Sequence, residues 1–413
     1  MKRSSSVICG LIAACLLASC NGRGPQTPGD GTVDLSGSGT GCSNCYLIGK
    51  EGRYSFDATV MGNGKAVEGL DAPSALNPAG AKLVWQTSKG MIEDVRFEDG
   101  NISFEATGAN GNALLAALDA DGNIIWSWHI WFPEQQPSTM TTKTGYELMD
   151  MNLGAMRPEF DSDDDVKPYG LLYQWGRKDP FTNAPTRTGD TQTVGATVYD
   201  ADGNEVVFGS SSMTSTEQNT IAFSIANPTV CISNMAQYYT SKDWLEASQG
   251  NDALWGNPLG YERDEDNAYP NKGSKSYYDP CPAGYRVPPA DVFRSFTSSG
   301  GYTESFDSVD AYDISGDGQI GEEDYNCGWM FNMESGHSFF PAAARYDGSY
   351  AMLYGSVSGL WGSYWSNCPS YVTGSGGLGH ACLSFSKQAR GYTFSPSAGG
   401  SKADAYSVRC IKE

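Results

Sequence analysis

The feature that most constrains this fold is a period-two hydrophobic pattern between Cys45 and about Pro133. Four stretches alternate apolar and polar residues, or run apolar between Gly, Asn and Asp: GRYSFDATV, AKLVWQT, NISFEAT and NALLAALDADGNIIWSWHIWF. Successive side chains of a strand point to opposite faces, so the pattern predicts strands between turns. Asp121-Gly122 predicts a tight hairpin between the last two apolar runs. We therefore expect a small β-sandwich over residues 45–135.

The last of these strands carries three tryptophans, Trp126, Trp128 and Trp131, together with His129. Such a strand can present a carbohydrate-stacking face, or it can bury its alternate aromatics in the core of the sandwich. Large aromatic side chains on an alternating strand are more often buried than exposed. We favour the core interpretation.

The N-terminus has the composition of an export signal. It begins MKR and continues with an apolar segment, residues 7–17, that is shorter than the roughly 20 residues a bilayer requires. We predict a signal peptide over residues 1–19. The motif LASC resembles the lipobox of bacterial lipoproteins, which implies lipid attachment at Cys20 and anchoring at the outer membrane or cell surface, facing the periplasm or the outside. Residues 20–44, rich in Gly, Ser, Thr and Pro, predict a flexible tether.

The charge balance excludes one class of partner. The chain has 27 Lys and Arg against 48 Asp and Glu, a net charge of −21, and removal of a signal peptide would make it more negative. Nucleic acids and anionic head groups need concentrated Lys and Arg, so we expect no nucleic-acid partner and membrane contact only through the lipid. The 50 Gly, 10 Trp and 23 Tyr indicate a loop-rich β protein of the extracellular recognition type.

The cysteines favour disulfides. Of eleven, Cys9 and Cys15 lie in the predicted signal and Cys20 is the predicted lipid site, which leaves eight. An even number in an exported chain indicates disulfides, but the count alone does not give their pairing. A zinc site is the alternative, yet only Cys42 and Cys45 are closely spaced and no second such pair follows.

The composition and the predicted strand length change after a polar connector at residues 133–145. Predicted strands become shorter, and Gly and aromatic residues become more frequent. Two helices are predicted, one near residues 233–248 and one at VPPADVFRSF, where Pro289 suits the first helical turn.

Five stretches of this second part resemble a known family. They are MDMNLGA (149–155), YGLLYQWGRKDPF (169–181), YDPCPAGYRVPPADVF (278–293), YWSN (364–367) and SVRCIKE (407–413). Together they resemble the FISUMP (Fibrobacter succinogenes major paralogous) domain of surface lipoproteins from Bacteroidetes-type bacteria, over residues 146–413. The stretches NCYLIGKEGRYSFDATVMGNG and GNIIWSWHIWF resemble the β-sandwich that precedes this domain in fimbrial tip-type proteins.

The resemblance implies an irregular α+β domain similar to C-type-lectin-like and formylglycine-generating-enzyme-like folds, within a mainly β chain. In such folds the first and last segments lie together, which implies a disulfide between Cys281 and Cys410. The local spacing of Cys368 and Cys382 suggests a second one. Aromatics of such a Gly-rich fold are expected in the core: Trp175, Trp365, Phe339 and Phe340.

Residues 313–324, DISGDGQIGEED, match the oxygen-ligand spacing of an EF-hand calcium loop. The predicted ligands are Asp313, Ser315, Asp317, Gln319 through its carbonyl, and Asp324. Gly318 permits the bend and Ile320 is expected in the core. The alternative is a polar turn with Asp and Gly present for geometry. We expect a structural Ca²⁺ site, inserted in the FISUMP-like scaffold. The similar stretches LDADGNII and YDADGNEV are predicted to be Asp-Gly hairpin turns instead.

No motif of an enzyme stands out. The three histidines do not form H-E-x-x-H, and no G-x-S-x-G occurs. We expect no enzymatic activity, and predict an exported, lipid-anchored surface binding protein, an adhesin or fimbrial tip-type subunit that recognises glycans or a partner surface. A structural pilus component that assembles with pilin subunits by strand addition is the alternative, and an enzyme acting on polysaccharide ranks below both.

Overall fold

The structure is a computed structural model of the chain. It describes residues 31–37, 39–188, 193–262, 269, 272–302, 305–369, 380–389 and 391–413. The predicted signal peptide, the predicted lipid site Cys20 and residues 21–30 and 38 of the predicted tether lie outside the described residues. The prediction that the flexible tether reaches residue 44 is wrong, because Val33–Asp34 pair with a strand and Asn44 is buried. Strands account for 32% and helices for 9%, so the fold is mainly β, as predicted.

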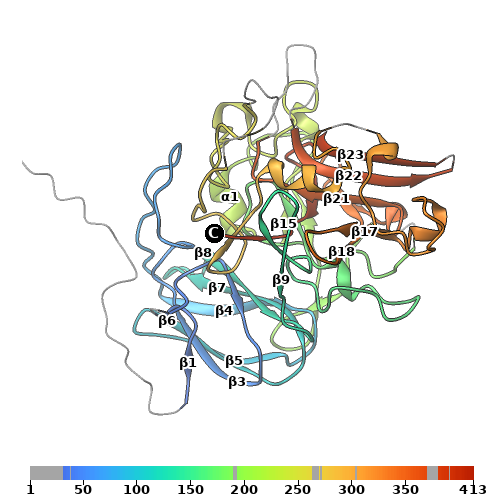
Figure 1. The fold of residues 1–413 in the computed structure, drawn as a ribbon. Helices are drawn as coiled ribbons and strands as arrows, with labels where there is room; N and C mark the ends of the chain where they lie inside the picture. Colours follow the sequence, from blue (N-terminus) through green and yellow to red (C-terminus); the bar gives the residue numbers. More distant parts are fainter. Residues whose placement is uncertain are drawn as a thin grey trace, which may run out of the picture.

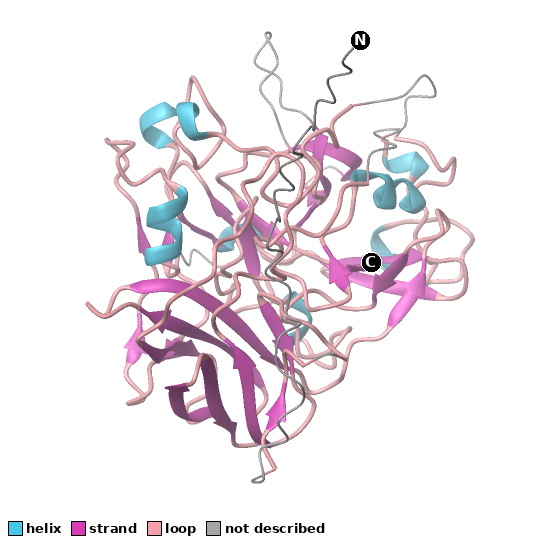
Figure 2. Ribbon diagram, turned by 90° about the vertical axis from the view of Figure 1, so that its left-hand side faces the viewer, coloured by secondary structure: helices cyan, strands magenta, loops and turns pink. Residues whose placement is uncertain are grey.

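Two β-sheets of the N-terminal part lie against each other, in the lower half of Figure 1 and at the lower left of Figure 2. The first has the order β1 (Val33–Asp34), β3 (Gly52–Asp57), β6 (Asn101–Ala106) and β5 (Ile92–Glu98). The second has the order β13 (Glu205–Val206), β12 (Val198–Tyr199), β4 (Gly80–Gln86), β7 (Gly111–Leu118), β8 (Ile124–Phe132) and β2 (Cys45–Leu47).

Strand β8 is buried on both faces. Trp126 and Trp128 belong to the hydrophobic cluster between the two sheets, where the Phe56 ring of β3 lies 5.1 Å from that of Trp128. Trp131 points the other way, into a second cluster that includes Trp175 of the C-terminal part. All three tryptophans of the strand are fully buried, so their predicted burial is confirmed, but only Trp126 and Trp128 lie between the two sheets.

The two DADGN stretches form the predicted hairpins. Asp119 Oδ1 accepts a hydrogen bond from the backbone N–H of Asn123 at 2.8 Å, in the turn between β7 and β8. Asp200 Oδ1 accepts the equivalent bond from Asn204 at 2.8 Å, in the turn between β12 and β13. The aspartates therefore close turns through backbone N–H bonds.

The second sheet continues across the connector between the predicted domains. The β12–β13 hairpin comes from the C-terminal part, yet it joins β4 with Tyr199 opposite Gln86. The cluster around Trp131 likewise contains residues from both parts. The predicted ranges 45–135 and 146–413 therefore share one core.

The C-terminal part is built on further small sheets, with β21, β22 and β23 at the upper right of Figure 1. The largest has the order β20 (Met352–Tyr354), β19 (Arg345–Asp347), β24 (Ala405–Ser407), β21 (Trp361–Trp365), β22 (His380–Gln388) and β23 (Gly391–Gly399), with β11 (Leu172–Gln174) on β24. A second has the order β16 (Tyr285–Arg286), β25 (Ile411–Lys412), β10 (Glu147–Met149) and β9 (Thr139–Thr141). Two strand pairs complete the part: β17 (Gly328–Asn332) with β18 (His337–Pro341), and β14 (Gly209–Ser210) with β15 (Val230–Cys231).

The beginning and the end of the C-terminal part lie side by side. Leu148 of β10 is opposite Ile411 of β25, and the backbone N–H of Met149 donates to the Cys410 carbonyl at 2.9 Å. Cys281 and Cys410 form a disulfide with their Cα atoms 6.0 Å apart, the pairing that the family resemblance implied.

The predicted Cys368–Cys382 disulfide is wrong. Strand pairing places Cys382 of β22 opposite Trp365 of β21, three residues before Cys368. Cys382 is a reduced, buried thiol that donates to the Ala398 carbonyl at 3.5 Å. The closely spaced pair considered for zinc is also split, because Cys42 is disulfide-bonded whereas Cys45 is a buried thiol.

Helices are short. The α-helix α1 (Ile221–Ala226) begins at Thr220, whose hydroxyl accepts the Phe223 N–H at 3.0 Å. The remaining helical turns are of the 3₁₀ type: Lys167–Tyr169, Met235–Gln237, Ala247–Gln249, Ala290–Phe296, Phe306–Ser308, Glu322–Asp324 and Gly355–Val357. The predicted helix after Pro289 therefore exists, as a 3₁₀ helix that Pro289 precedes.

The helix predicted over residues 233–248 is wrong, because tertiary contacts take over its polar groups. The Ser233 hydroxyl donates to the Ser349 carbonyl at 2.6 Å, and the Trp244 indole N–H donates to the Trp175 carbonyl at 2.7 Å. Only single 3₁₀ turns remain near its ends. The aromatics predicted in the core are all buried: Trp175, Trp365, Phe339 and Phe340.

Candidate functional site

The predicted calcium loop is closed at both ends by carboxylates that accept N–H bonds. Asp313 accepts the Gly318 backbone N–H at 2.7 Å and the Ser315 hydroxyl at 3.0 Å. Asp324 is 1% exposed, and its two oxygens accept the N–H groups of Ser315 at 2.9 Å and Gly321 at 2.8 Å. Asp313, Ser315 and Asp324, the first, second and last of the predicted ligands, are therefore linked by hydrogen bonds within the loop.

The donor set of this loop suits calcium chemically. It offers three carboxylates, a hydroxyl and the Gln319 carbonyl, the hard oxygen donors that Ca²⁺ takes. The N–H bonds lower the pKa of Asp313, led by that from Gly318, and an ionised carboxylate keeps further lone pairs for an ion. Asp317 instead accepts the Gln319 N–H at 2.8 Å. Within the described residues, no three His, Cys, Asp or Glu side chains are grouped so as to hold a metal ion, and calcium binding stays a prediction.

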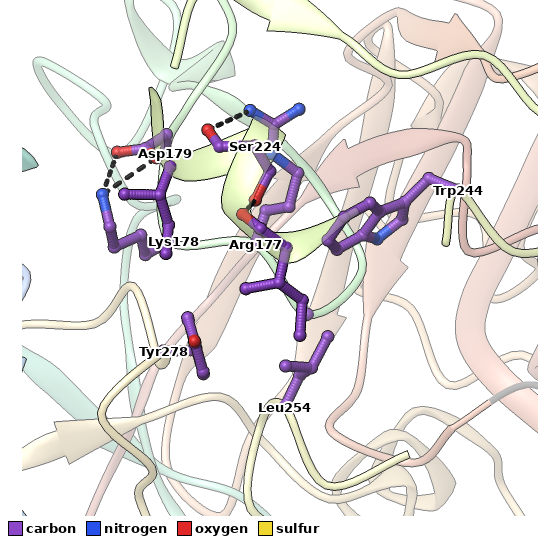
Figure 3. A pocket seen from close by; sticks show the side chains of 10 residues that line it. Arg177, Lys178, Asp179, Ser224, Trp244, Leu254 and Tyr278 are labelled. Carbon is purple, nitrogen blue, oxygen red and sulfur yellow. Dashed lines mark hydrogen bonds and ion pairs between the residues drawn. The ribbon is translucent and has the colours of Figure 1, made fainter. Parts of the chain in front are cut away.

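A small cavity lies where the C-terminal part meets strand β8. Figure 3 shows Arg177, Lys178 and Asp179 beside it, with Trp244 and Tyr278 on its other sides. The volume is about 10 Å³, which is the space of one water molecule. A cavity of that size does not admit a sugar or a peptide, so these charged residues serve another purpose.

Lys178 and Asp179 form a buried ion pair against strand β8. The Lys178 ammonium lies 2.7 and 2.9 Å from the two Asp179 oxygens, and 2.5 Å from the Ser127 hydroxyl, which itself donates to Asp179 at 2.6 Å. Both charged residues are almost fully buried, and burial lowers the pKa of Lys178 against the opposing effect of Asp179. The pair links the C-terminal part to the N-terminal sheet.

Arg177 caps the end of helix α1. Its guanidinium donates to the carbonyls of Val230 at 2.8 Å and Ser224 at 3.4 Å, and to the Gln174 side chain at 2.8 Å. Burial lowers its pKa, and its Nε has no hydrogen-bond partner in the part of the chain that the structure describes. The motif QWGRKDPF therefore supplies structural charges. In the sequence, the three consecutive charged residues Arg177, Lys178 and Asp179 within an apolar stretch indicate this structural role.

The histidines do not converge on a site. His129 is buried on β8, and its Nε2 lies 2.8 Å from Asn112 Oδ1. Burial lowers its pKa to about 3, so the ring is neutral at physiological pH. His337 stacks on Tyr312 with ring centroids 4.2 Å apart, and the side chain of His380 lies outside the described residues.

Large side chains are exposed on strand β20 and just before it. Tyr350, Met352 and Tyr354 are 52%, 38% and 45% exposed, while Leu353 between them is buried. Arg345 of β19 and Trp361 of β21 adjoin them, because the guanidinium carbon of Arg345 lies near both the Tyr354 and the Trp361 rings. We call these five residues the β20 face: Arg345, Tyr350, Met352, Tyr354 and Trp361.

Comparison of the chain with protein-family models, with curated proteins and with solved structures found no match. The resemblance to the FISUMP family therefore stays a prediction. No helix of the described chain is long and apolar enough to cross a bilayer.

Sequence reasoning missed the β20 face. Its signal is the stretch YAMLY, residues 350–354, which alternates like a half-buried strand but has large side chains at the outer positions as well as apolar ones inside. Ala351 and Leu353 are buried, so only the structure shows which set faces the solvent.

Proposed function

We propose that this chain is an exported, lipid-anchored surface binding protein, an adhesin or fimbrial tip-type subunit that recognises glycans or a partner surface. The observation that carries the proposal is the exposure of Tyr350, Met352 and Tyr354 on one edge of the largest sheet. Tyr, Trp, Met and Arg are the residues that binding surfaces concentrate, because they supply contact area with few rotatable bonds or a guanidinium fork.

The scaffold under this face is suited to present it. Leu353 is 1% exposed and anchors β20 in a hydrophobic cluster with Tyr346 and Ala405. Strand β24, which pairs with β19, ends at Ser407, three residues before Cys410 of the Cys281–Cys410 disulfide. The outer side chains therefore stand on a rigid element, which lowers the entropy lost on binding.

We also infer the finer architecture of the two parts. The packing of Phe56 on Trp128 between two sheets supports a β-sandwich in the N-terminal part. The pairing of β10 with β25 and the Cys281–Cys410 disulfide support a C-type-lectin-like C-terminal domain, in which the first and last segments adjoin.

A glycan array tests the function. The purified full chain in detergent micelles is expected to bind a subset of glycans, and the double variant Tyr354→Ser/Met352→Ser is expected to lose that binding. Tyr312→Ser is the matched control, because Tyr312 is 44% exposed but stacks on His337 of another strand pair. Glycan binding that survives in the double variant would show that the β20 face does not carry the function.

Calcium at the 313–324 loop has a structural role in this proposal. Asp313, Ser315, Asp317, the Gln319 carbonyl and Asp324 would hold the ion, which neutralises the carboxylates of the loop. Ile320 packs against the cluster around Phe331 and ties the loop to β17. The ion would stiffen this loop and takes no part in sugar binding.

Assembly by strand addition is the second candidate function, favoured by how the N-terminal segment pairs. β1 and β2 run parallel to β3 and β8, respectively, each at an edge of a sheet, and Cys45 of β2 also forms a parallel bridge with Pro282. Each edge is thus closed by a short strand that arrives from a remote segment and not from a hairpin. Such a strand can be replaced by the equivalent strand of another subunit.

A paired-cysteine variant tests strand exchange. Asp34 of β1 is opposite Ser55 of β3, so Asp34→Cys/Ser55→Cys would form a disulfide within one chain, or between chains where β1 is exchanged. Loss of the intrachain cross-link on addition of pilin subunits is the expected result of exchange, because a pilin strand in place of β1 carries no partner cysteine. Cross-links confined to single chains at every subunit concentration would contradict it.

A further inference from the structure

The outer surface of the largest sheet holds an arginine between two aromatic rings. The guanidinium carbon of Arg345 lies 4.4 Å from the ring centroid of Trp361 and 5.9 Å from that of Tyr354. Arg345 of β19 is directly opposite Tyr354 of β20 in the strand register, while Trp361 begins β21 on the far side of β24. The arrangement therefore comes from three separate strands of one rigid sheet.

The charge of Arg345 is not matched by a contacting carboxylate. None of the ion pairs within the described residues includes Arg345, and its Nε is buried without a hydrogen-bond partner there. By contrast, the guanidinium of Arg409 donates to Asn152 Oδ1 at 2.8 Å and to the Phe339 carbonyl at 2.7 Å. Arg345 has a hydrogen bond with the Tyr406 side chain, but it has no carboxylate partner among the described residues, so part of its guanidinium fork is available to a ligand.

The acidic groups near Arg345 are engaged elsewhere. Asp404 accepts the Gly348 N–H at 2.8 Å and the Tyr406 hydroxyl at 2.7 Å, and Asp347 accepts the Ser349 N–H at 2.8 Å. Burial acts to lower the pKa of Arg345, but the charges of Tyr406, Asp404 and Asp347 outweigh it, and the pKa is raised. The guanidinium therefore stays charged while no carboxylate contacts it.

We propose that Arg345, Trp361 and Tyr354 bind the carboxylate-bearing sugar of an acidic glycan, an inference that rests on the proposed function. The guanidinium fork matches a carboxylate in two parallel hydrogen bonds, which a neutral sugar does not offer. The flanking rings accept the apolar faces of the sugars. Their centroids are no more than about 10 Å apart, the sum of their two distances from Arg345, which is a span that a disaccharide covers.

A carboxylated glycan fits better than a protein partner. The net charge of the chain is −21, so Arg345, which contacts no carboxylate of the described chain, is a local positive group on an acidic molecule and suits one negative group at short range. The polar side chains of the same sheet face, such as Ser384 and Thr393, are small hydroxyls, which hydrogen-bond to sugar hydroxyls.

Paired probes test the proposal. The panel contains oligogalacturonate, hyaluronan oligosaccharide and sialyllactose, each also in its methyl-esterified form, in which the ring is kept and the charge is removed. Binding of the full chain in detergent micelles is measured by titration calorimetry. We expect at least one acid form to bind about tenfold or more tightly than its ester, because a charged hydrogen-bonded pair is lost.

Variants assign the effect to this site. Arg345→Gln is expected to lower the affinity for the acid form by about 10- to 100-fold and to remove the preference over the ester. Trp361→Ala is expected to weaken both forms alike, and Arg345→Lys to keep part of the preference. Arg96→Gln is the control, because Arg96 is on β5 and is paired with Asp94 at 2.6 Å. The melting temperature of each variant checks that it is folded.

Two results overturn the proposal, and they separate it from the proposed function. The first is glycan or protein binding that keeps its full acid preference in Arg345→Gln, or that has no acid preference in the wild type. This result refutes the site at Arg345 and leaves the proposed binding function in place. A chain that binds no glycan on the array refutes both the glycan-binding function and this site.

Discussion

His129 makes stability depend on pH in a way that the structure fixes. The Asn112 side chain donates through Nδ2 to the Gly154 carbonyl at 2.8 Å, so its Oδ1 faces His129 Nε2 at 2.8 Å as an acceptor. Nε2 therefore carries the proton, and Nδ1 is the nitrogen that would gain one in acid. Nδ1 is buried without a hydrogen-bond partner among the described residues, so a proton there places an unpaired charge in the core.

The size of the effect follows from the pKa. Burial lowers the pKa of His129 from 6.5 to about 3 in the folded chain, while the unfolded chain keeps the ordinary value. The unfolded state therefore binds the proton first as the pH falls, and stability is lost from about pH 6.5 down towards pH 3. At pH 4 the loss from this one group is about 3 kcal/mol, from about 1.4 kcal/mol per pH unit.

Urea unfolding followed by tryptophan fluorescence measures this loss. The wild type and the variant His129→Gln, which can still donate to Asn112 but does not titrate, are compared at intervals from pH 7 to pH 4. Other groups titrate in both chains, so the difference between the two curves isolates His129. The wild type should lose about 3 kcal/mol more than the variant. Equal losses in the two chains would refute the burial of an unpaired Nδ1.

Three further predictions concern stability. Lys178→Met should lower the free energy of unfolding by about 3–5 kcal/mol, because it leaves Asp179 buried and unpaired. The control Lys387→Met breaks an exposed pair with Glu322 and should cost about 1 kcal/mol or less. Equal costs of the two variants in urea unfolding would contradict this prediction. Calcium at ten times its Kd should stabilise the wild type by about 1.4 kcal/mol and raise its melting temperature, and Asp317→Ala should abolish the rise while the hairpin control Asp121→Ala retains it. Cys281→Ala/Cys410→Ala should cost about 2–5 kcal/mol in urea, and a reducing agent should then destabilise the variant less than it destabilises the wild type, because among the described residues only the disulfide of Cys42 remains to be reduced.

The sequence was most informative where local chemistry decides the structure. Both DADGN stretches predicted hairpins, because the aspartate side chain closes the turn within five residues and needs no partner from elsewhere. The alternation around Trp126 and Trp128 likewise predicted their burial. These features depend on the strand period and on turn geometry, which are properties of short segments.

Features that depend on distant residues were missed. A strand such as β8, buried on both faces, owes its second face to Trp175 and Lys178, which lie about 50 residues further on. The same holds for residues 233–248, where the contact of Ser233 with Ser349 replaces helical hydrogen bonds. Cys368 and Cys382 are near in sequence, yet strand register separates them. Tertiary contacts override local preference in all three cases.

The two candidate sites, the 313–324 loop and the β20 face, differ in the same way in how far the sequence predicts them. The 313–324 loop was predicted as a calcium site from its spacing, because its predicted ligands are all within twelve residues. The β20 face was not found, because Arg345, Tyr354 and Trp361 become neighbours only when β19, β20 and β21 enter one sheet. Nothing in the spacing of an arginine and two aromatics indicates which of them will share a face.

The central claim is that the chain binds a ligand outside the cell through its β20 face. The most direct measurement is the adhesion of intact cells to immobilised glycans. One set of cells displays the wild type and the other displays Tyr354→Ser/Met352→Ser, and protease shaving measures how much of each protein is on the cell surface. The account predicts adhesion by wild-type cells and its loss in the variant at equal display. Equal adhesion of the two, or a chain that protease cannot reach on intact cells, would contradict it.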